Sequence, residues 1–354
     1  MDLSTLGFDR WFQEEQEKSL DPGFATARVA EVNRDSYVVI GIKGEVYAEL
    51  AGSAIFSAKS SMDFPAVGDW VCVEYHNEGT FAIIHRIYKR KSFLRRKTAG
   101  KQIDYQLIAA NIDIALIVQS VGTDFNMRRL ERYLVMIKEG NIEPVLVLTK
   151  TDLVGPEILT KKISEVIGSN IVMKILPISN VTGTGLDQIH RLLTTGKTYC
   201  LIGSSGVGKT TLVNHLIGQD LFETGEVRTR DGRGKHITAR RQLIVLPNGA
   251  MIIDTPGMRE LGIIGFRRGI DLSFEDIGEL SRICRFSNCN HTSDWGCALR
   301  KAIENGKLSK QRYDNYIKLV RESEYHQLSY FEKRQKDRKF RQFIKKTMKH
   351  NKKF

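Results

Sequence analysis

Residues 198–218, TYCLIGSSGVGKTTLVNHLIG, decide the fold of this chain. They predict a buried strand, a glycine-rich turn and the start of a helix. The turn fits the phosphate-loop pattern G-x-x-x-x-G-K-[ST], in which glycines let backbone N–H groups surround phosphates at a helix N-terminus. Lys209 would neutralise phosphate charge, and the Thr210 hydroxyl would bind Mg²⁺. We therefore expect a nucleoside triphosphate to bind at Gly203, Ser204, Ser205, Gly206, Val207, Gly208, Lys209, Thr210 and Thr211.

A second nucleotide element lies downstream, in AMIIDTPGMRELG, residues 250–262. A hydrophobic strand ends there in D-x-x-G, where Asp254 would hold Mg²⁺ through water and the Gly257 N–H would meet the γ-phosphate. The intervening residues 225–243, GEVRTRDGRGKHITARRQL, are rich in glycine and arginine and lack apolar periodicity. We interpret them as a switch loop in which Thr238 binds Mg²⁺.

The position after D-x-x-G is Met258, which cannot orient an attacking water as a glutamine does. His236 lies two residues before Thr238 and can exchange hydrogen bonds near neutral pH, so we predict that it positions the water. The alternatives are a solvated loop histidine or one that binds RNA phosphate.

Two elements that could select the base come before the phosphate loop. VLVLTKTD supplies Thr149, Lys150, Thr151 and Asp152 after a strand, and ILPISN supplies Ser179 and Asn180. Asp152 could accept both N–H groups of guanine, the Lys150 stem could pack over the base, and a backbone N–H near Ser179 could meet guanine O6. The first element alone could be a solvated turn. Together with the second element and the phosphate loop, it predicts that the bound nucleotide is GTP. The Asp152 carboxylate disfavours ATP.

Along the chain, the two base-selecting elements come first, followed by the phosphate loop, the switch loop and the Mg²⁺-binding D-x-x-G element. In a standard small GTP-binding domain the base-selecting elements come last. We therefore predict a circularly permuted α/β nucleotide domain over residues 101–268. Continuous apolar runs such as ANIDIALIVQS alternate with amphipathic helices such as RRLERYLVMIKEG, as in a doubly wound parallel sheet. Permutation is compatible with the fold because domain termini often lie close together.

The residues before this domain have a different pattern. Residues 1–24 are a partly helical extension, and residues 25–100 alternate apolar and polar residues in short segments separated by turns. About five short strands, with KSFLRRK among the segments, predict a small OB-type β-barrel. A basic run at its end favours RNA contact, the alternative being a structural barrel with a solvated rim. The run comprises Lys89, Arg90, Lys91, Arg95, Arg96 and Lys97.

Residues 269–330 predict a small, mainly helical domain with a metal site. Cys284, Cys289, His291 and Cys297 follow the spacing C-x4-C-x-H-x5-C, and three thiolates with one imidazole make a closed tetrahedral set for Zn²⁺. Because four protein ligands leave no open position, the zinc would be structural. The other two cysteines, Cys72 and Cys200, lie in apolar runs and are expected to be buried thiols.

Charge and composition limit the class of protein. The net charge is +13, and the tail at residues 331–354 holds eleven Lys/Arg and two acids, or +9 of it. This asymmetry favours a polyanionic partner, RNA before DNA or membrane. Without an apolar run of about 18 residues or a cleavable leader, we expect a cytoplasmic monomer with no membrane contact.

The barrel, permuted domain and zinc domain together resemble the family of ribosome small subunit-dependent GTPase A, RsgA, also called YjeQ or YloQ. The motifs AANIDIALIVQS, DFNMRRLERYL, GSSGVGKTTLVN, GRGKHITAR and DTPGMRELG carry the resemblance, which covers essentially the whole chain. It implies a bacterial GTPase stimulated by the small ribosomal subunit, acting late in that subunit's maturation, with rRNA binding and one Zn²⁺. It also implies that His236 is catalytic.

Four positions differ from common patterns. Thr149 replaces an asparagine, Asn180 an alanine, and Ile237 the first threonine of H-T-T, while Met258 in place of glutamine is usual for the family. An alternative to a GTPase is an RNA-binding module that the nucleotide switches with negligible turnover. A DNA-binding zinc protein is disfavoured, because no helix beside the zinc ligands has recognition spacing.

Overall fold

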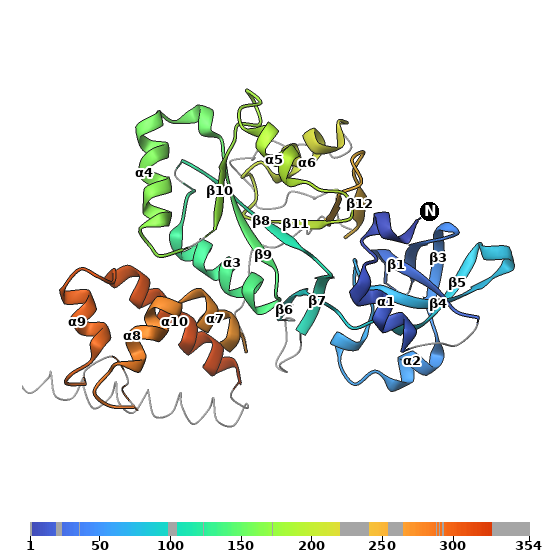
Figure 1. Ribbon diagram of the computed structural model, residues 1–354, viewed down its shortest axis with the longest axis horizontal. Helices are drawn as coiled ribbons and strands as arrows, with labels where there is room; N and C mark the ends of the chain where they lie inside the picture. Colours follow the sequence, from blue (N-terminus) through green and yellow to red (C-terminus); the bar gives the residue numbers. More distant parts are fainter. Residues whose placement is uncertain are drawn as a thin grey trace, which may run out of the picture.

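The computed structural model describes residues 2–18, 23–34, 36–97, 105–122, 124–171, 173–219, 241–253, 265–287, 289, 291 and 294–327. Figure 1 shows a β-barrel, a central α/β unit and a C-terminal group of helices. Four predicted site residues lie outside the described residues, as does the basic tail at 331–354. These four are His236, Thr238, Asp254 and Gly257.

The N-terminal unit is a closed barrel with the strand order β1-β2-β3-β5-β4, in which β4 pairs back to β1. Strands β3 and β5 are parallel, and the other pairs are antiparallel. Small and β-branched residues, among them Ala27, Val39 and Val73, fill its interior. This confirms the predicted five-stranded barrel. Its strands are Ala25–Val32, Tyr37–Gly41, Gly44–Leu50, Trp70–His76 and Phe81–Ile87, and α2 is Gly52–Ser57.

One segment expected in the barrel lies outside it. Strand β6 (Phe93–Lys97), which contains the basic FLRRK sequence, pairs with β7 (Tyr105–Ala110) in a separate two-stranded sheet. The reason is that five strands already close the barrel and leave no free edge for a sixth. Part of the predicted basic run therefore belongs to the connection between the barrel and the central unit.

The central sheet has the order β10-β9-β8-β11-β13-β12. Its pairs are parallel except for β12 with β13. Alternate residues of β8 enter two core clusters, Leu116 and Val118 on one face and Ala115 and Ile117 on the other. Both faces are thus buried, which is why the strands read as continuous apolar runs. The strands are β8 (Ile114–Ser120), β9 (Glu143–Thr149), β10 (Lys174–Pro177), β11 (Thr198–Ile202), β12 (Leu243–Val245) and β13 (Met251–Ile253).

Helices cover both faces of this sheet. Residues of α3 (Met127–Glu139) and α4 (Pro156–Ile167) share a core with one face, and residues of α5 (Leu186–Leu192) and α6 (Lys209–Ile217) share a core with the other. This is the doubly wound architecture that the alternating pattern predicted. The structure also places the phosphate loop after the base-selecting strands in the chain, in the predicted permuted order.

The C-terminal helices pack on α3 (Figure 1). They are α7 (Arg267–Ser273), α8 (Glu275–Arg282), α9 (Ala298–Glu304) and α10 (Lys310–Gln327). A Cβ at Gly269 would lie 2.1 Å from the Val135 carbonyl oxygen, so glycine there permits the close approach of α7 to α3. Among the described residues, no helix is both long and apolar enough to cross a membrane.

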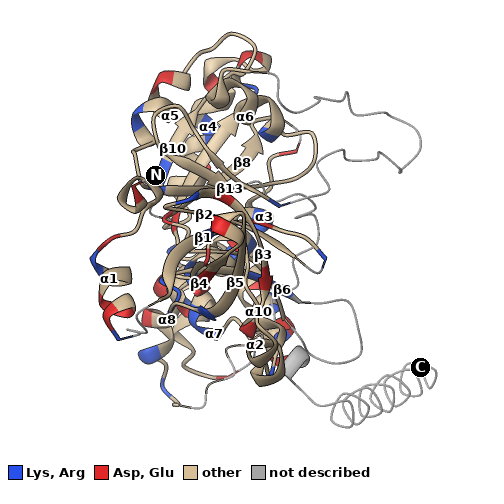
Figure 2. Cartoon of the chain, turned by 90° about the vertical axis from the view of Figure 1, so that its right-hand side faces the viewer, with Lys and Arg blue, Asp and Glu red and all other residues tan. Residues whose placement is uncertain are grey.

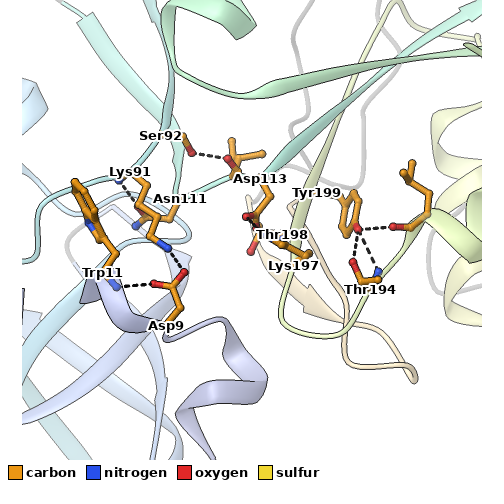
Figure 3. A network of polar contacts seen from close by, with 12 residues as sticks. Asp9, Trp11, Lys91, Ser92, Asn111, Asp113, Thr194, Lys197, Thr198 and Tyr199 are labelled. Carbon is orange, nitrogen blue, oxygen red and sulfur yellow. Dashed lines mark hydrogen bonds and ion pairs between the residues drawn. The ribbon is translucent and has the colours of Figure 1, made fainter. Parts of the chain in front are cut away.

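A polar junction joins the barrel, the N-terminal segment and the central sheet. Arg28 of β1 is completely buried and donates to the Leu6 carbonyl at 2.5 Å, the Asn111 carbonyl at 3.2 Å and the Thr198 hydroxyl at 2.8 Å. Figure 3 shows the surrounding network, in which Lys91 contacts Asp9 and Lys197 contacts Asp113 at 2.8 Å. The N-terminal helix α1 (Arg10–Glu17) packs beside this junction through Phe12.

Candidate functional site

The phosphate loop lies between β11 and α6, at the carboxyl end of the parallel sheet. Gly206 and Gly208 have φ angles of 77° and 94°, which side chains rarely adopt. A Cβ at Gly203 would lie 2.2 Å from the Val118 carbonyl oxygen, so glycine lets the loop approach β8. The Lys209 ammonium lies across the loop and donates to the carbonyls of Gly203 at 2.9 Å and Ser204 at 2.6 Å. Thr210 and Thr211 follow Lys209 in the first turn of α6.

The two predicted base elements lie at the same edge of the sheet and are hydrogen-bonded to the phosphate loop. Thr149, fully buried at the end of β9, donates its hydroxyl to the Val207 carbonyl at 2.6 Å. Asn180, which follows β10, donates its amide to the Gly208 carbonyl at 3.0 Å. Both departures from the common motif residues therefore have a structural function here: each side chain holds a base element against the loop.

The Asp152 carboxylate is oriented by Ser179. The Ser179 hydroxyl donates to Asp152 Oδ1 at 2.5 Å and accepts the backbone N–H groups of Val181 at 3.2 Å and Thr182 at 3.1 Å. Lys150, with a left-handed φ of 59°, precedes the 3-10 turn Thr151–Leu153. Because Ser179 engages only one carboxylate oxygen, an exposed acceptor remains available beside the loop.

The four predicted zinc ligands come together, with their donor atoms all within 4.8 Å of one another. His291 Nδ1 lies 3.6 Å from Cys284 Sγ and 3.8 Å from Cys297 Sγ, so this nitrogen faces the cluster. The other ring nitrogen, Nε2, lies 2.9 Å from the Ser281 hydroxyl, which fixes the ring. Three thiols and one imidazole in this arrangement fit a tetrahedral Zn²⁺, whose bonds to sulfur and nitrogen are about 2.0–2.3 Å.

The comparisons with known proteins agree with this geometry. The protein-family model described as RsgA GTPase matches residues 87–264 of this chain. The chain is 44% identical over 307 residues to "Small ribosomal subunit biogenesis GTPase RsgA 2" of Lactiplantibacillus plantarum, covering 87% of this chain and 86% of that protein. The chain belongs to the RsgA GTPase family. Another relative, "Small ribosomal subunit biogenesis GTPase RsgA 1" of Listeria innocua, is 40% identical over 326 residues, which cover 92% of this chain and 90% of that protein.

Solved structures related to the RsgA family have the same fold. YjeQ from Thermotoga maritima is 25% identical, with a TM-score of 0.61, covering 84% of this chain and 97% of that one. YloQ, described as a circularly permuted GTPase, is 24% identical, with a TM-score of 0.60, covering 84% of this chain and 94% of that one. The likeness thus covers most of this chain and nearly all of each solved structure, as expected from the RsgA resemblance.

Sequence reasoning missed two residues beside the phosphate loop of this RsgA-family chain. Arg129, in the first turn of α3, donates to the Ser204 hydroxyl at 2.5 Å. Gln119, at the end of β8, accepts the Asn126 N–H at 3.0 Å, while its buried amide nitrogen has no hydrogen-bond partner. Both lie in motifs that carry the family resemblance, Arg129 in DFNMRRLERYL and Gln119 in AANIDIALIVQS, but those motifs give neither residue a role at the site. The signal that could have found them is topological, because the carboxyl ends of parallel strands and the turns after them meet at one edge.

The predicted basic run is mostly engaged within the protein. The Arg90 guanidinium makes two hydrogen bonds of 2.8 Å to the buried Asp69 carboxylate, and Arg95 stacks 4.3 Å from the Tyr105 ring. Lys91 contacts Asp9, and Arg96 donates to Gln106 at 2.9 Å. These four cations thus support the structure rather than form a solvated rim. In Figure 2, acidic and basic residues are intermingled over the described part of the chain.

Proposed function

We propose that this chain is a GTPase that binds the small ribosomal subunit, acts in its late maturation and hydrolyses GTP to GDP and phosphate with subunit-stimulated turnover. The observation that carries the nucleotide part is the pair of hydrogen bonds from Thr149 and Asn180 to the phosphate loop. These bonds support a site in which the elements that carry the Asp152 carboxylate, which suits guanine, adjoin a loop that suits phosphates. The names of the relatives support the ribosomal part.

Each part of the site has a proposed role. Backbone N–H groups of the loop, with those of Thr210 and Thr211 at the N-terminus of α6, bind the phosphates. Lys209 exchanges its carbonyl partners for phosphate oxygens, since an ammonium group prefers a charged acceptor. Asp152 accepts the guanine N–H groups, and the stem of Lys150 packs on the base.

Thr210 would hold Mg²⁺, and Thr238 and Asp254, which lie outside the described residues, would complete the set. When bound, the ion offsets phosphate charge during transfer. The zinc cluster is proposed to be structural, because its four protein donors form a closed set.

His236 is the proposed catalytic residue, acting on the attacking water, and it too lies outside the described residues. Met258 offers no hydrogen bond for this task.

We propose that RNA binds the basic tail at residues 331–354. Most of the basic run beside the barrel is engaged within the protein, and the chain without the tail has a net charge of only +4. We also propose that the protein is cytoplasmic and monomeric.

Hydrolysis by the His236→Ala variant separates this proposal from a nucleotide-switched RNA-binding module with negligible turnover. We expect the variant to bind GTP as the wild type does and to lose about 10²-fold or more in kcat, in the range of general acid–base effects. Lys209→Ala, which should abolish binding, is the reference for a lost site. If wild-type turnover is negligible even with small subunits, the chain is instead the nucleotide-switched RNA-binding module.

A further inference from the structure

Helix α3 lies between the central sheet and the C-terminal helices (Figure 1). Its apolar residues Leu130 and Leu134 are buried in the core that both units share. Polar residues of the same first turns make contacts in two directions, Arg129 with the phosphate loop and Glu131 and Arg132 with α10. Within the described residues, this helix therefore contacts both the C-terminal helices and the phosphate loop.

Toward the nucleotide site, Arg129 contacts the loop itself. One terminal nitrogen donates to the Ser204 hydroxyl at 2.5 Å, and the other donates to Asp124 Oδ1 at 2.9 Å. The carbonyl of the same Ser204 accepts the Lys209 ammonium at 2.6 Å. Ser204 thus joins Arg129 to the lysine that would contact phosphate, and a displacement of Arg129 would move both.

Toward the C-terminal helices, the neighbouring Glu131 takes part in a buried ionic network. Its carboxylate accepts from Arg312 at 2.8 Å and from the Asn315 amide, and Arg312 also binds Asp276 at 2.7 and 2.9 Å. The side chains of Glu131 and Arg312 are each 4% exposed. Separating these groups would leave uncompensated buried charges, so α3 and α10 are expected to move together.

The next residue adds a second ionic contact to α10. Arg132 binds Glu322 through two parallel hydrogen bonds of 2.6 Å. Bidentate pairs of this kind fix direction as well as distance. Residues 129–132 span less than one helical turn, about 4.5 Å along the axis. The loop contact and both contacts to α10 are therefore on one rigid segment.

We propose that Arg129 is a positioning residue for the phosphate loop, and that the α3 turn at residues 129–132 couples the C-terminal helices to nucleotide binding. The inference rests on the proposed nucleotide site. A partner that shifts α10 would alter nucleotide affinity through Glu131, Arg132 and Arg129. By linkage, the nucleotide would alter the affinity for that partner by the same factor.

The loop half of the proposal is tested in the full chain with a fluorescent GDP analogue and with steady-state GTP hydrolysis. Arg129→Ala should weaken nucleotide binding and raise KM by about three- to thirtyfold, with a smaller change in kcat. Arg129→Lys should restore part of the affinity. In a Ser204→Ala background, Arg129→Ala should have a much smaller effect. The matched control is Arg128→Ala, an exposed arginine of the same helix, which should bind as the wild type does.

The coupling half is tested by Glu322→Gln, a change on α10 beyond the nucleotide site. It should change the dissociation constant of the GDP analogue by at least about twofold, and it should have no effect when Arg129 is already alanine. Thermal unfolding is followed for each variant, so that only folded proteins are compared. Additive effects of the two changes, or an Arg129→Ala variant that binds like Arg128→Ala, would overturn the proposal. If the wild type bound no guanine nucleotide, the proposed function itself would fail.

Discussion

Asp152 shows at the scale of a single residue how the site could choose its base. A carboxylate can accept two N–H groups, and the Ser179 hydroxyl at 2.5 Å holds one of its oxygens while leaving the other exposed. Adenine presents a different arrangement of donors and acceptors to this position. Base selection therefore depends on a charged acceptor in a fixed place.

Replacing this acceptor by an amide tests base selection. Asp152→Asn should weaken GTP binding by about tenfold or more, because hydrogen bonds to a charged group contribute about 1.5–3 kcal/mol. Binding is measured by displacement of a fluorescent GDP analogue. Asp187→Asn, at an exposed carboxylate of α5 that pairs with Arg191, is the control and should have no effect. Unchanged GTP affinity in Asp152→Asn would remove the carboxylate from base recognition.

At the scale of elements, the metal cluster determines how two short helices meet. Cys284 follows the end of α8, and Cys297 is the N-cap of α9, so the ligand set joins the end of one helix to the start of the next. The Cys284 sulfur also accepts the Ala298 N–H at 3.4 Å. Helices of seven or eight residues are marginal without such a constraint.

Metal content gives a direct test of this element. The purified chain should contain one zinc per molecule, and Cys289→Ala should lose it together with part of the C-terminal helical signal in circular dichroism. Structural zinc contributes about 10–16 kcal/mol of binding free energy in small domains, so chelation should melt this element first. Cys72→Ala, at a buried cysteine of the barrel, should retain its zinc. Full zinc content in Cys289→Ala would contradict the ligand set.

Elements with strong local signals could be predicted from the sequence. The structure confirms the strand, turn and helix around Gly203, and it brings together the four side chains from Cys284 to Cys297 that the spacing predicted to cluster. Both features could be predicted because the geometry of glycine and the spacing of metal ligands act over a few residues. The pairing of β6 with β7 was missed, since alternating patterns do not say which edge a strand joins. Arg90 likewise belongs to a run for which the sequence favours RNA contact, and the pattern does not reveal its ion pair with Asp69, 21 residues earlier.

At the scale of the whole molecule, the buried Arg28 links segments that are far apart in the chain. Among the described residues, it donates to the carbonyls of Leu6, Gly68 and Asn111, to the Thr198 hydroxyl and to the Met251 sulfur, and none of these is a carboxylate. Burial lowers the pKa of Arg28 to about 10. The guanidinium thus stays charged at pH 7, and the cost of burying its charge should be constant below about pH 9 and fall only as the pH rises toward the pKa of the unfolded chain.

Removing this guanidinium should loosen the junction between the units. Arg28→Met leaves the Leu6 and Asn111 carbonyls without their donor, at about 1–3 kcal/mol for each buried group. We expect the midpoint of thermal unfolding to fall by about 5 °C or more. The same loss should appear at pH 6 and pH 9. Arg86→Met, at an exposed arginine of the barrel, is the control, and an equal midpoint in the two variants would show that Arg28 does not hold the junction.

The central claim is that this GTP site is stimulated by the small ribosomal subunit. The most direct measurement is steady-state hydrolysis of GTP and ATP by the purified chain, alone and with small subunits, large subunits or an equal mass of tRNA. We expect weak GTP turnover alone, a steep rise with small subunits only, and little ATP turnover throughout. A rate that small subunits leave unchanged, or that tRNA raises equally, would contradict it.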